Sequence, residues 1–433
     1  MRRPHRLLAL CACLCFPAAL AQPADPIAGA QADVDTLASA AYAGRGYARG
    51  GAAKAAAYVE RRFRAIGLEP AFESGFQQPF GFEKDLVTGT PVLSADGAPL
   101  ALGDGFLPYG STASGKGRNV RVVDVGHGLT LRPLGVDAYE GKAVRGKVAL
   151  VSAPIPDALR EVDGLPPAVL SRPFQMQVAE ANGAKAVIFL DDAPLFGHST
   201  FDAPLPVFEV ARAAWPGAER VSFRVEARQN AQVEAANVVG QVRGTGEPDS
   251  VLLVTAHLDG LGSLGPDHYF PGANDNASGV AMLLALAETV QRVPLRHTVV
   301  FAALGGEESG LKGAFHLAEY PPVPLGRVRF LLNFDMVASA EDGLLVFGGR
   351  DHPAEYGLLE RLNAERGGGP LAARGNRANS DHWAFTEQGV PGFYLLTKDG
   401  TQPYHSLRDV PETLEWDDFA RAFYLAEAFL RGL

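Results

Sequence analysis

Histidine and carboxylate side chains follow several apolar, strand-like runs in the second half of the chain. They are His257 after VLLVTA, Asp275 in GANDNASG, Glu307 and Glu308 after TVVFAALGG, Asp335 after FLLNF, and His405 in TQPYHSLRD. Imidazole nitrogen and carboxylate oxygen suit Zn²⁺, and a site with an open coordination position suits catalysis. Five ligands can serve two metals if one carboxylate bridges them, which leaves one of the adjacent glutamates free to act as a base. Each residue alone is a weak signal, but together they predict a catalytic metal centre.

The segments that must position these side chains alternate between apolar strands and helices from residue 237 onward. Strand-like runs are VLLVTAH, TVVFAALGG, VRFLLNFDMV, GLLVFGG and GVPGFYLL, and helix-like runs are VAMLLALAETVQRV, YGLLERLNAERG and WDDFARAFYLAEAFLRG. This alternation predicts an α/β fold with a mixed, mostly parallel sheet flanked by helices. In such sheets, ligand sites gather at the carboxyl ends of the strands. The candidate metal-binding residues occupy those positions.

The same segments resemble the co-catalytic dizinc aminopeptidase family. AHLDG, GANDNASGVAMLLALA, FAALGGEESGLKGA, NFDM, SDHWAF and YHS occur in the order of that family and with similar gaps. The family includes bacterial leucyl aminopeptidases, glutamate carboxypeptidase and the catalytically inactive transferrin receptor. The resemblance covers about residues 237–433 and the N-terminal helix. It implies the three-layer zinc exopeptidase fold and an enzyme that releases N-terminal residues from peptides or proteins.

The resemblance also implies a role for each candidate residue. His257 and Asp335 would hold one zinc, Glu308 and His405 a second, and Asp275 would bridge the two ions. Glu307 would be the general base that takes a proton from a metal-bridging water and returns it to the leaving amine. Asp259 would orient the His257 imidazole from outside the metal shell. In relatives the peptide bond after the bridging aspartate is cis, which places a cis bond at Asp275–Asn276.

The residue that stabilises the oxyanion is less well defined. Some relatives place a tyrosine upstream of the SDH motif, but LAARGNRANSDH contains none. Tyr404, directly before His405, is the preferred candidate, and His382 is a weaker one. Asp381 and His382 either shape the substrate pocket or tie down a loop, and we favour the structural role. We expect His268, Arg374 and Arg377 to be exposed rather than functional.

Other functions of the same fold remain open. Single-zinc glutaminyl cyclases resemble this chain around the glutamate pair but usually lack the first histidine, so His257 favours two metals. A carboxypeptidase acting on acidic dipeptides is a further possibility. A non-catalytic, receptor-like binding protein is the alternative from another class, but such relatives lose ligands or the base, and the sequence retains all of them.

The pattern of apolar and polar residues in 85–231 differs from that in the rest of the chain. Short β-like runs broken by Gly and Pro surround one helix, PFQMQVAEANGA, and no Cys or paired His occurs there. The order of strand, helix, AVIFL strand and Pro-Val segment resembles the protease-associated domain. We therefore expect a small, β-rich inserted α/β domain at 85–231, between residues 22–84 and 232–433 of the peptidase domain.

The first 21 residues have the features of a secretory signal peptide. Arg2, Arg3 and Arg6 precede the apolar run LLALCACLCFPAALA, and Ala19-Leu20-Ala21 suits cleavage before Gln22. The run is shorter than a spanning helix, so we expect a periplasmic or secreted protein without an integral membrane segment. All cysteines lie in this run, and lipid anchoring at Cys13 is the alternative. The net charge of -10 disfavours nucleic-acid binding.

Overall fold

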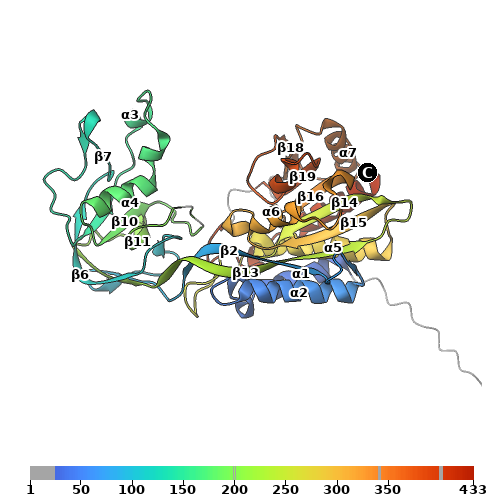
Figure 1. Cartoon of the computed structure of the whole chain (residues 1–433), viewed down its shortest axis with the longest axis horizontal. Coiled ribbons are helices and arrows are strands. Elements are labelled where there is room, and N and C mark those ends of the chain that lie inside the picture. The colour runs from blue at the N-terminus through green and yellow to red at the C-terminus, as the bar shows by residue number, and fades with distance from the viewer. Residues whose placement is uncertain (1–24, 198, 200, 340–342, 399–402) are drawn as a thin grey trace, which may run out of the picture.

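The computed structural model describes residues 25–197, 199, 201–339, 343–398 and 403–433. The expected signal peptide and its cysteines lie outside these residues. Two β-sheets, each with its own core, are joined by a long antiparallel ribbon, with the smaller sheet on the left of Figure 1 and the larger on the right. Within the described residues, no helix is both long and apolar enough to cross a membrane.

The larger sheet has the strand order β1-β13-β15-β14-β16-β19-β17-β18, and β2 pairs with β13. Its strands are β1 (Glu69–Pro70), β2 (Gln77–Val87), β13 (Ala227–Val242), β14 (Glu247–His257), β15 (His297–Leu304), β16 (Val328–Phe334), β17 (Leu344–Phe347), β18 (Leu371–Arg374) and β19 (Gly392–Thr397). The central strands β15, β14, β16 and β19 are parallel to one another. Their carboxyl ends therefore lie along one edge of the sheet.

Helices cover both faces of the larger sheet. They are α1 (Pro26–Leu37), α2 (Gly51–Ile66), α5 (Gly279–Arg292), α6 (Lys312–Glu319), α7 (Pro353–Glu365), α8 (Trp383–Thr386) and α9 (Trp416–Gly432). Side chains alternate along β14: Leu252 and Val254 join the core under α1, α2, α5 and α9, whereas Leu253 joins the core under α6 and α8. The predicted α/β fold, with helices on both faces of a mixed sheet, is confirmed.

The smaller sheet has the order β4-β3-β12-β6-β9-β10-β11-β5. Its strands are β3 (Val92–Ala95), β4 (Ala98–Pro99), β5 (Phe106–Pro108), β6 (Gly115–Asp124), β9 (Val148–Val151), β10 (Ala186–Asp191), β11 (Val207–Ala211) and β12 (Arg220–Val225), accompanied by the β7 (Thr130–Leu131) and β8 (Val136–Asp137) hairpin and by helices α3 (Asp157–Arg160) and α4 (Arg172–Ala181). Strands β6, β9, β10 and β11 are parallel. We call residues 92–225 the inserted unit; whether it is a protease-associated domain stays a prediction.

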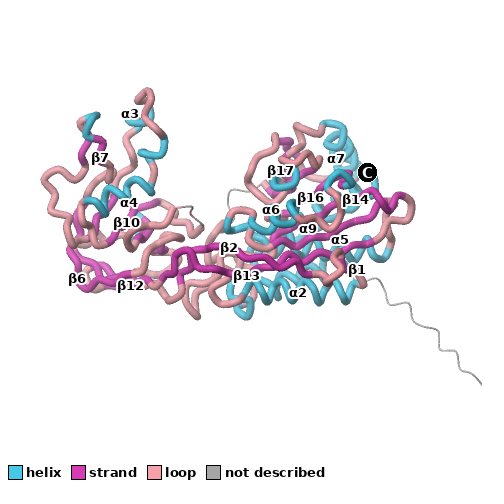
Figure 2. Tube along the Cα trace, viewed as in Figure 1, coloured by secondary structure: helices cyan, strands magenta, loops and turns pink. Residues whose placement is uncertain are grey.

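The ribbon of β2 and β13 connects the two sheets. Its pairing runs from Gln77 opposite Val238 to Val87 opposite Ala227. Figure 2 shows these two strands as a continuous magenta ribbon between the two parts of the molecule. The ribbon crosses both boundaries expected at 84/85 and 231/232, so the chain passes between the sheets along paired strands rather than through a linker.

Candidate metal centre

The candidate ligands lie at the carboxyl edge of the larger sheet. His257 is the last residue of β14, and Asp335 directly follows β16. Glu307 and Glu308 follow β15 in a short 3-10 turn, Glu307–Ser309. Asp275 lies in the turn that precedes α5, and His405 lies in the loop after β19. The parallel arrangement thus brings together all six residues that the sequence singled out.

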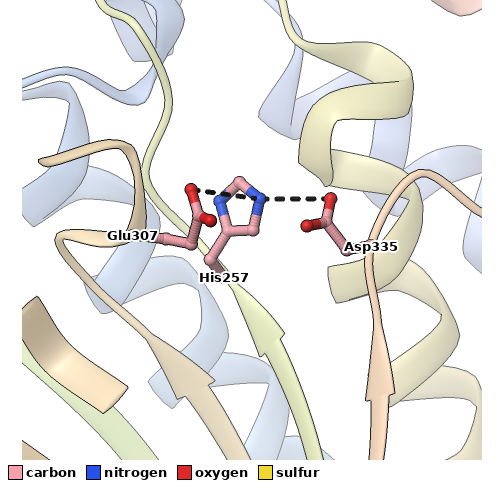
Figure 3. A group of neighbouring side chains, drawn as sticks. All are labelled: His257, Glu307 and Asp335. Atoms are coloured by element: carbon pink, nitrogen blue, oxygen red, sulfur yellow. Dashed lines mark hydrogen bonds and ion pairs between the residues drawn. The ribbon is translucent and has the colours of Figure 1, made fainter. Parts of the chain in front are cut away.

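These residues form two groups, each with donor atoms within 4.8 Å of one another: His257, Glu307 and Asp335, and then Asp275, Glu308 and His405. In the first group, shown in Figure 3, His257 Nε2 lies 3.3 Å from Asp335 Oδ1 and 4.0 Å from Glu307 Oε2. In the second, His405 Nε2 lies 3.4 Å from Glu308 Oε2. Ligands bound tetrahedrally to zinc at about 2.0–2.1 Å lie about 3.3 Å apart, so the two groups fit a metal by their donor types and their spacing.

Asp275 links the two groups. Its Oδ1 lies 3.3 Å from His257 Nε2, and its Oδ2 lies 3.3 Å from His405 Nε2. One carboxylate therefore offers a separate oxygen to each imidazole, which is the geometry that a bridging ligand requires. The peptide bond from Asp275 to Asn276 is cis, as the family resemblance implied.

The site contains more buried negative charge than the chain itself neutralises. Burial raises the pKa of Glu307 well above its ordinary value, and the nearby Glu308 and Asp335 raise it further. Burial alone would lower the pKa of His405, but the carboxylates of Glu308 and Asp275 raise it to about 10. Burial would raise the pKa of Asp275, yet its contacts with both imidazoles lower it overall. Such a cluster favours the binding of cations.

Asp259 lies beside His257. The Nδ1 atom of His257 is 3.3 Å from the backbone oxygen of Asp259 and 3.9 Å from its carboxylate. The Asp259 Oδ1 atom accepts a hydrogen bond of 3.0 Å from the backbone N–H of Glu307. The backbone oxygen of Asp259 is thus nearer to the His257 imidazole than its carboxylate is. The Asp259 carboxylate instead holds the turn Glu307–Ser309.

The oxyanion candidates occupy different environments. The Tyr404 ring stacks on His405 with 3.7 Å between ring centroids, and its side chain is 44% exposed. His382 is fully buried, and burial lowers its pKa to about 4. Asp381 is also fully buried, and burial raises its pKa to about 8. Tyr404 is therefore the candidate that a substrate can reach. His268 is half-buried, whereas Arg374 and Arg377 are exposed.

Sequence reasoning missed Arg45 and Asp409, which hold the turn that carries Asp275. The buried Arg45 guanidinium donates hydrogen bonds to the backbone oxygens of Pro271 at 2.7 Å, Gly272 at 2.7 Å and Asp275 at 3.0 Å. The Asp409 carboxylate accepts from the backbone N–H groups of Asn274 at 2.8 Å and Asp275 at 3.0 Å. Asp409 lies in the same loop as His405, so Arg45 and Asp409 tie together the two loops that carry the candidate ligands Asp275 and His405.

Ser380 is a third residue that the sequence did not single out. Its hydroxyl donates a hydrogen bond of 2.7 Å to Asp335 Oδ2 and accepts one of 2.9 Å from Asn333 Nδ2. The other oxygen, Oδ1, faces His257. Ser380 thus fixes the orientation of Asp335, and its place in the SDH motif was the available signal.

Comparison with known proteins agrees with this geometry. Residues 237–430 match Peptidase family M28. A probable zinc metalloprotease of Leptosphaeria maculans is 38% identical over 127 residues, which are 29% of this chain and 28% of that protein. A probable leucine aminopeptidase 2 of Aspergillus oryzae is 27% identical over 199 residues, 44% of this chain and 38% of that protein. An aminopeptidase of Pseudomonas aeruginosa is 35% identical over 128 residues, 29% and 22% of the respective chains. The chain thus spans well under half the length of these curated relatives.

Solved structures resemble the whole chain. A zinc aminopeptidase from Bacillus subtilis superposes with a TM-score of 0.70 at 23% identity and covers 94% of this chain and 95% of its own. An aminopeptidase from Aneurinibacillus sp. strain AM-1 superposes with a TM-score of 0.63 at 20% identity and covers 93% and 92%. These coverages include the inserted unit, so the two-sheet architecture is shared. The chain therefore carries a domain of Peptidase family M28, which spans residues 237–430.

Proposed function

We propose that this protein is an aminopeptidase that removes N-terminal residues from peptides at a centre of two zinc ions. The observation that carries the proposal is the position of Asp275, whose two oxygens face two imidazoles at 3.3 Å each. A bridging carboxylate with a histidine on either side supports two metals rather than one. The family domain and the names of the relatives support zinc and peptide substrates.

The ligand assignment follows the two side-chain groups. His257 and Asp335 would hold one zinc, Glu308 and His405 the other, and Asp275 both. Bound zinc would supply a Lewis acid and would lower the pKa of a coordinated water towards neutrality. Of the carboxylates facing His257, Glu307 is the most distant, at 4.0 Å. That greater distance makes Glu307 the group best suited to remain free as the base.

Glu307 would move the proton of the reaction. Its backbone is fixed by the hydrogen bond to Asp259 Oδ1. Its carboxylate would accept the proton of a water and could then deliver it to the leaving amine. The hydroxyl of Tyr404, a residue that is 44% exposed and stacks on His405, would donate to the oxygen that gains negative charge.

The first experiment is hydrolysis of aminoacyl p-nitroanilides by the purified chain, with zinc content measured on the same sample. We expect release of p-nitroaniline, loss of activity on chelation, recovery with zinc, and two zinc ions per chain. N-terminally acetylated substrates should not be cleaved. Absence of hydrolysis in zinc buffer contradicts the proposal. One zinc per chain, with pyroglutamate formed from glutaminyl peptides, would replace it with the cyclase alternative.

We also propose that the protein is exported to the periplasm or the medium. The basic residues Arg2, Arg3 and Arg6, the apolar run after them and the Ala19-Leu20-Ala21 sequence support this. N-terminal sequencing of the protein from its native cell should begin at Gln22. A mature N-terminus at Cys13 would instead indicate lipid anchoring.

A further inference from the structure

The ribbon that joins the two sheets also contacts the turn that carries the two adjacent glutamates. Lys84 lies on β2, opposite Ala231 of β13. Its ammonium group donates a hydrogen bond of 2.7 Å to the Ser309 hydroxyl, 225 residues further along the chain. Ser309 is 1% exposed and is the last residue of the 3-10 turn Glu307–Ser309. A side chain of the ribbon thus reaches the turn that carries the proposed base.

This turn is held at both of its ends. The backbone N–H of Glu307, its first residue, donates to Asp259 Oδ1 at 3.0 Å. The side chain of Ser309, its last residue, accepts from Lys84. Glu308, which belongs to the second candidate metal-binding group, lies between these two contacts. Loss of either contact would free one end of the segment from which both glutamates project.

Aromatic side chains pack around Lys84 on its way to the turn. The Lys84 ammonium lies over the Tyr47 ring, 5.8 Å from its centroid. Phe82, two residues earlier on the same face of β2, packs edge-on against Tyr47 with 5.2 Å between ring centroids. A Cβ atom on Gly306, directly before the turn, would lie 3.3 Å from the Phe82 ring. Lys84 is therefore a half-buried, packed side chain rather than a freely moving surface lysine.

We propose that Lys84 is a positioning residue, which holds the turn Glu307–Ser309 from the ribbon and thereby sets the direction of the Glu307 and Glu308 side chains. The inference rests on the proposed function, because it gives Lys84 a part in the work of Glu307 as the base. A small displacement of a catalytic group lowers the rate strongly, since the reaction needs closely aligned groups. A lysine that only attached the ribbon to the peptidase domain would stabilise the fold without affecting the turn or the turnover.

The first test measures the turn itself, by hydrogen–deuterium exchange of residues 305–312 in the purified chain saturated with zinc. The backbone N–H groups of Gly310 and Leu311 donate to the Glu307 oxygen at 2.8 and 2.9 Å, so their exchange reports opening of the turn. In Lys84→Met we expect exchange to quicken about tenfold, the scale of one hydrogen bond to a charged group. Ser309→Ala removes the bond but keeps the charge, and it should have a similar effect. The double variant should exceed neither single variant, because both changes remove the same contact.

Lys142→Met is the matched control. Lys142 also donates a hydrogen bond of 2.7 Å, to the backbone oxygen of Asp124 in the inserted unit, and its loss should leave exchange and turnover unchanged. On leucyl p-nitroanilide, Lys84→Met should lower kcat about tenfold and leave KM unchanged, because the position of the base acts on the transition state rather than on substrate binding. Lys84→Arg keeps a charged donor and should recover part of kcat.

Exchange and turnover together separate failure of this inference from failure of the proposed function. If the wild type cleaves substrates but kcat survives Lys84→Met, the positioning role is wrong and the function stands. If no substrate is cleaved yet exchange of 305–312 quickens in Lys84→Met, the function is wrong and the hold of Lys84 on the turn stands. Equally faster exchange in every segment would show that Lys84 supports only the fold. If Lys84→Met does not fold, Ser309→Ala decides, and unchanged exchange and kcat in that variant contradict the inference.

Discussion

The two sheets each present the carboxyl ends of parallel strands, and the polar residues there behave differently. At the edge of the larger sheet, His257 Nε2 lies 3.3 Å from Asp335 Oδ1 and 4.0 Å from Glu307 Oε2. At the edge of the smaller sheet, Asp124 accepts hydrogen bonds of 2.7 Å from the Ser152 hydroxyl and from a backbone N–H. Asp191, which ends β10, pairs with Arg172. The larger edge gathers several carboxylates around two imidazoles, whereas the smaller edge pairs Asp191 with a cation and gives Asp124 hydrogen-bond donors.

The difference indicates which strand ends form a site. Carboxyl-end positions are shared by both sheets, so position alone does not distinguish them. The larger edge holds several buried carboxylates, and burial, followed by the neighbouring carboxylates of Glu308 and Asp335, raises the pKa of Glu307. In the smaller edge, Arg172 contacts both Asp191 and the buried Glu209. Buried carboxylates without cationic side-chain partners thus distinguish the candidate metal centre. Carboxylates held by an arginine or by hydrogen-bond donors indicate a structural role at the edge of the smaller sheet.

The largest expected effect separates the two adjacent glutamates of the larger edge. Glu307→Gln should lower kcat by about 10²–10⁴-fold, because it removes the proposed general base, while the two proposed zinc ions remain bound. Glu308→Gln should lower activity and also zinc content, because it removes a proposed ligand. Steady-state kinetics and metal analysis on the same samples check both variants. Equal loss of zinc from both would show that the roles of the two glutamates are wrongly divided.

The sequence could single out the candidate ligands because their signals are local. Long apolar runs identify buried strands, and the residue after each run is read directly, as for His257 and Asp335. The supporting contacts are not local: Arg45 reaches carbonyls 226–230 residues further along the chain. A short loop motif cannot show which distant backbone atoms it will meet.

The next effect tests whether the turn that carries Asp275 needs Arg45. Arg45→Met should weaken zinc binding by about 10–100-fold, because backbone oxygens of Pro271, Gly272 and Asp275 lose their donor and the carboxylate is no longer held in place. Competition with a chelator of known affinity measures this. Arg62→Met is the control, since Arg62 pairs with Asp33 and Glu288 between helices. The control should lower stability without changing zinc affinity.

Arg45→Lys keeps the charge but cannot reproduce the planar set of donors. We expect it to recover only part of the zinc affinity lost in Arg45→Met. If Arg45→Met and Arg62→Met bind zinc equally well, Arg45 supports the fold and not the metal centre. The carboxylates at the edge of the larger sheet would then be positioned without help from Arg45.

A smaller effect is expected at the carboxyl edge of the smaller sheet, where Arg172 pairs with Asp191 and Glu209. Arg172→Met should destabilise the protein by about 1–2 kcal/mol, because Glu209 is left buried without its cationic partner, although Arg172 itself is partly exposed. Urea unfolding followed by fluorescence measures the change. Zinc content should stay at the wild-type value. Adding Glu209→Gln should restore part of the stability, since it removes the unpaired charge. A loss of zinc in Arg172→Met would contradict the separation of the two edges.

The smallest effect compares a histidine from each edge. His127 lies just after β6, and burial lowers its pKa. Burial alone would also lower the pKa of His257, but the carboxylates of Glu307 and Asp335 raise it overall. In chelated protein, NMR titration should find His127 neutral at pH 7 and His257 charged, with His127→Asn assigning the first signal. Because the folded pKa of His127 is below the unfolded value, its contribution to stability is present above pH 6.5 and falls as the pH drops below it. Zinc should stop the titration of His257, since a metal ligand must be deprotonated, and should leave that of His127 unchanged. A zinc-dependent shift at His127 would mean that the two edges are coupled, and the edge of the smaller sheet could no longer be treated as structural.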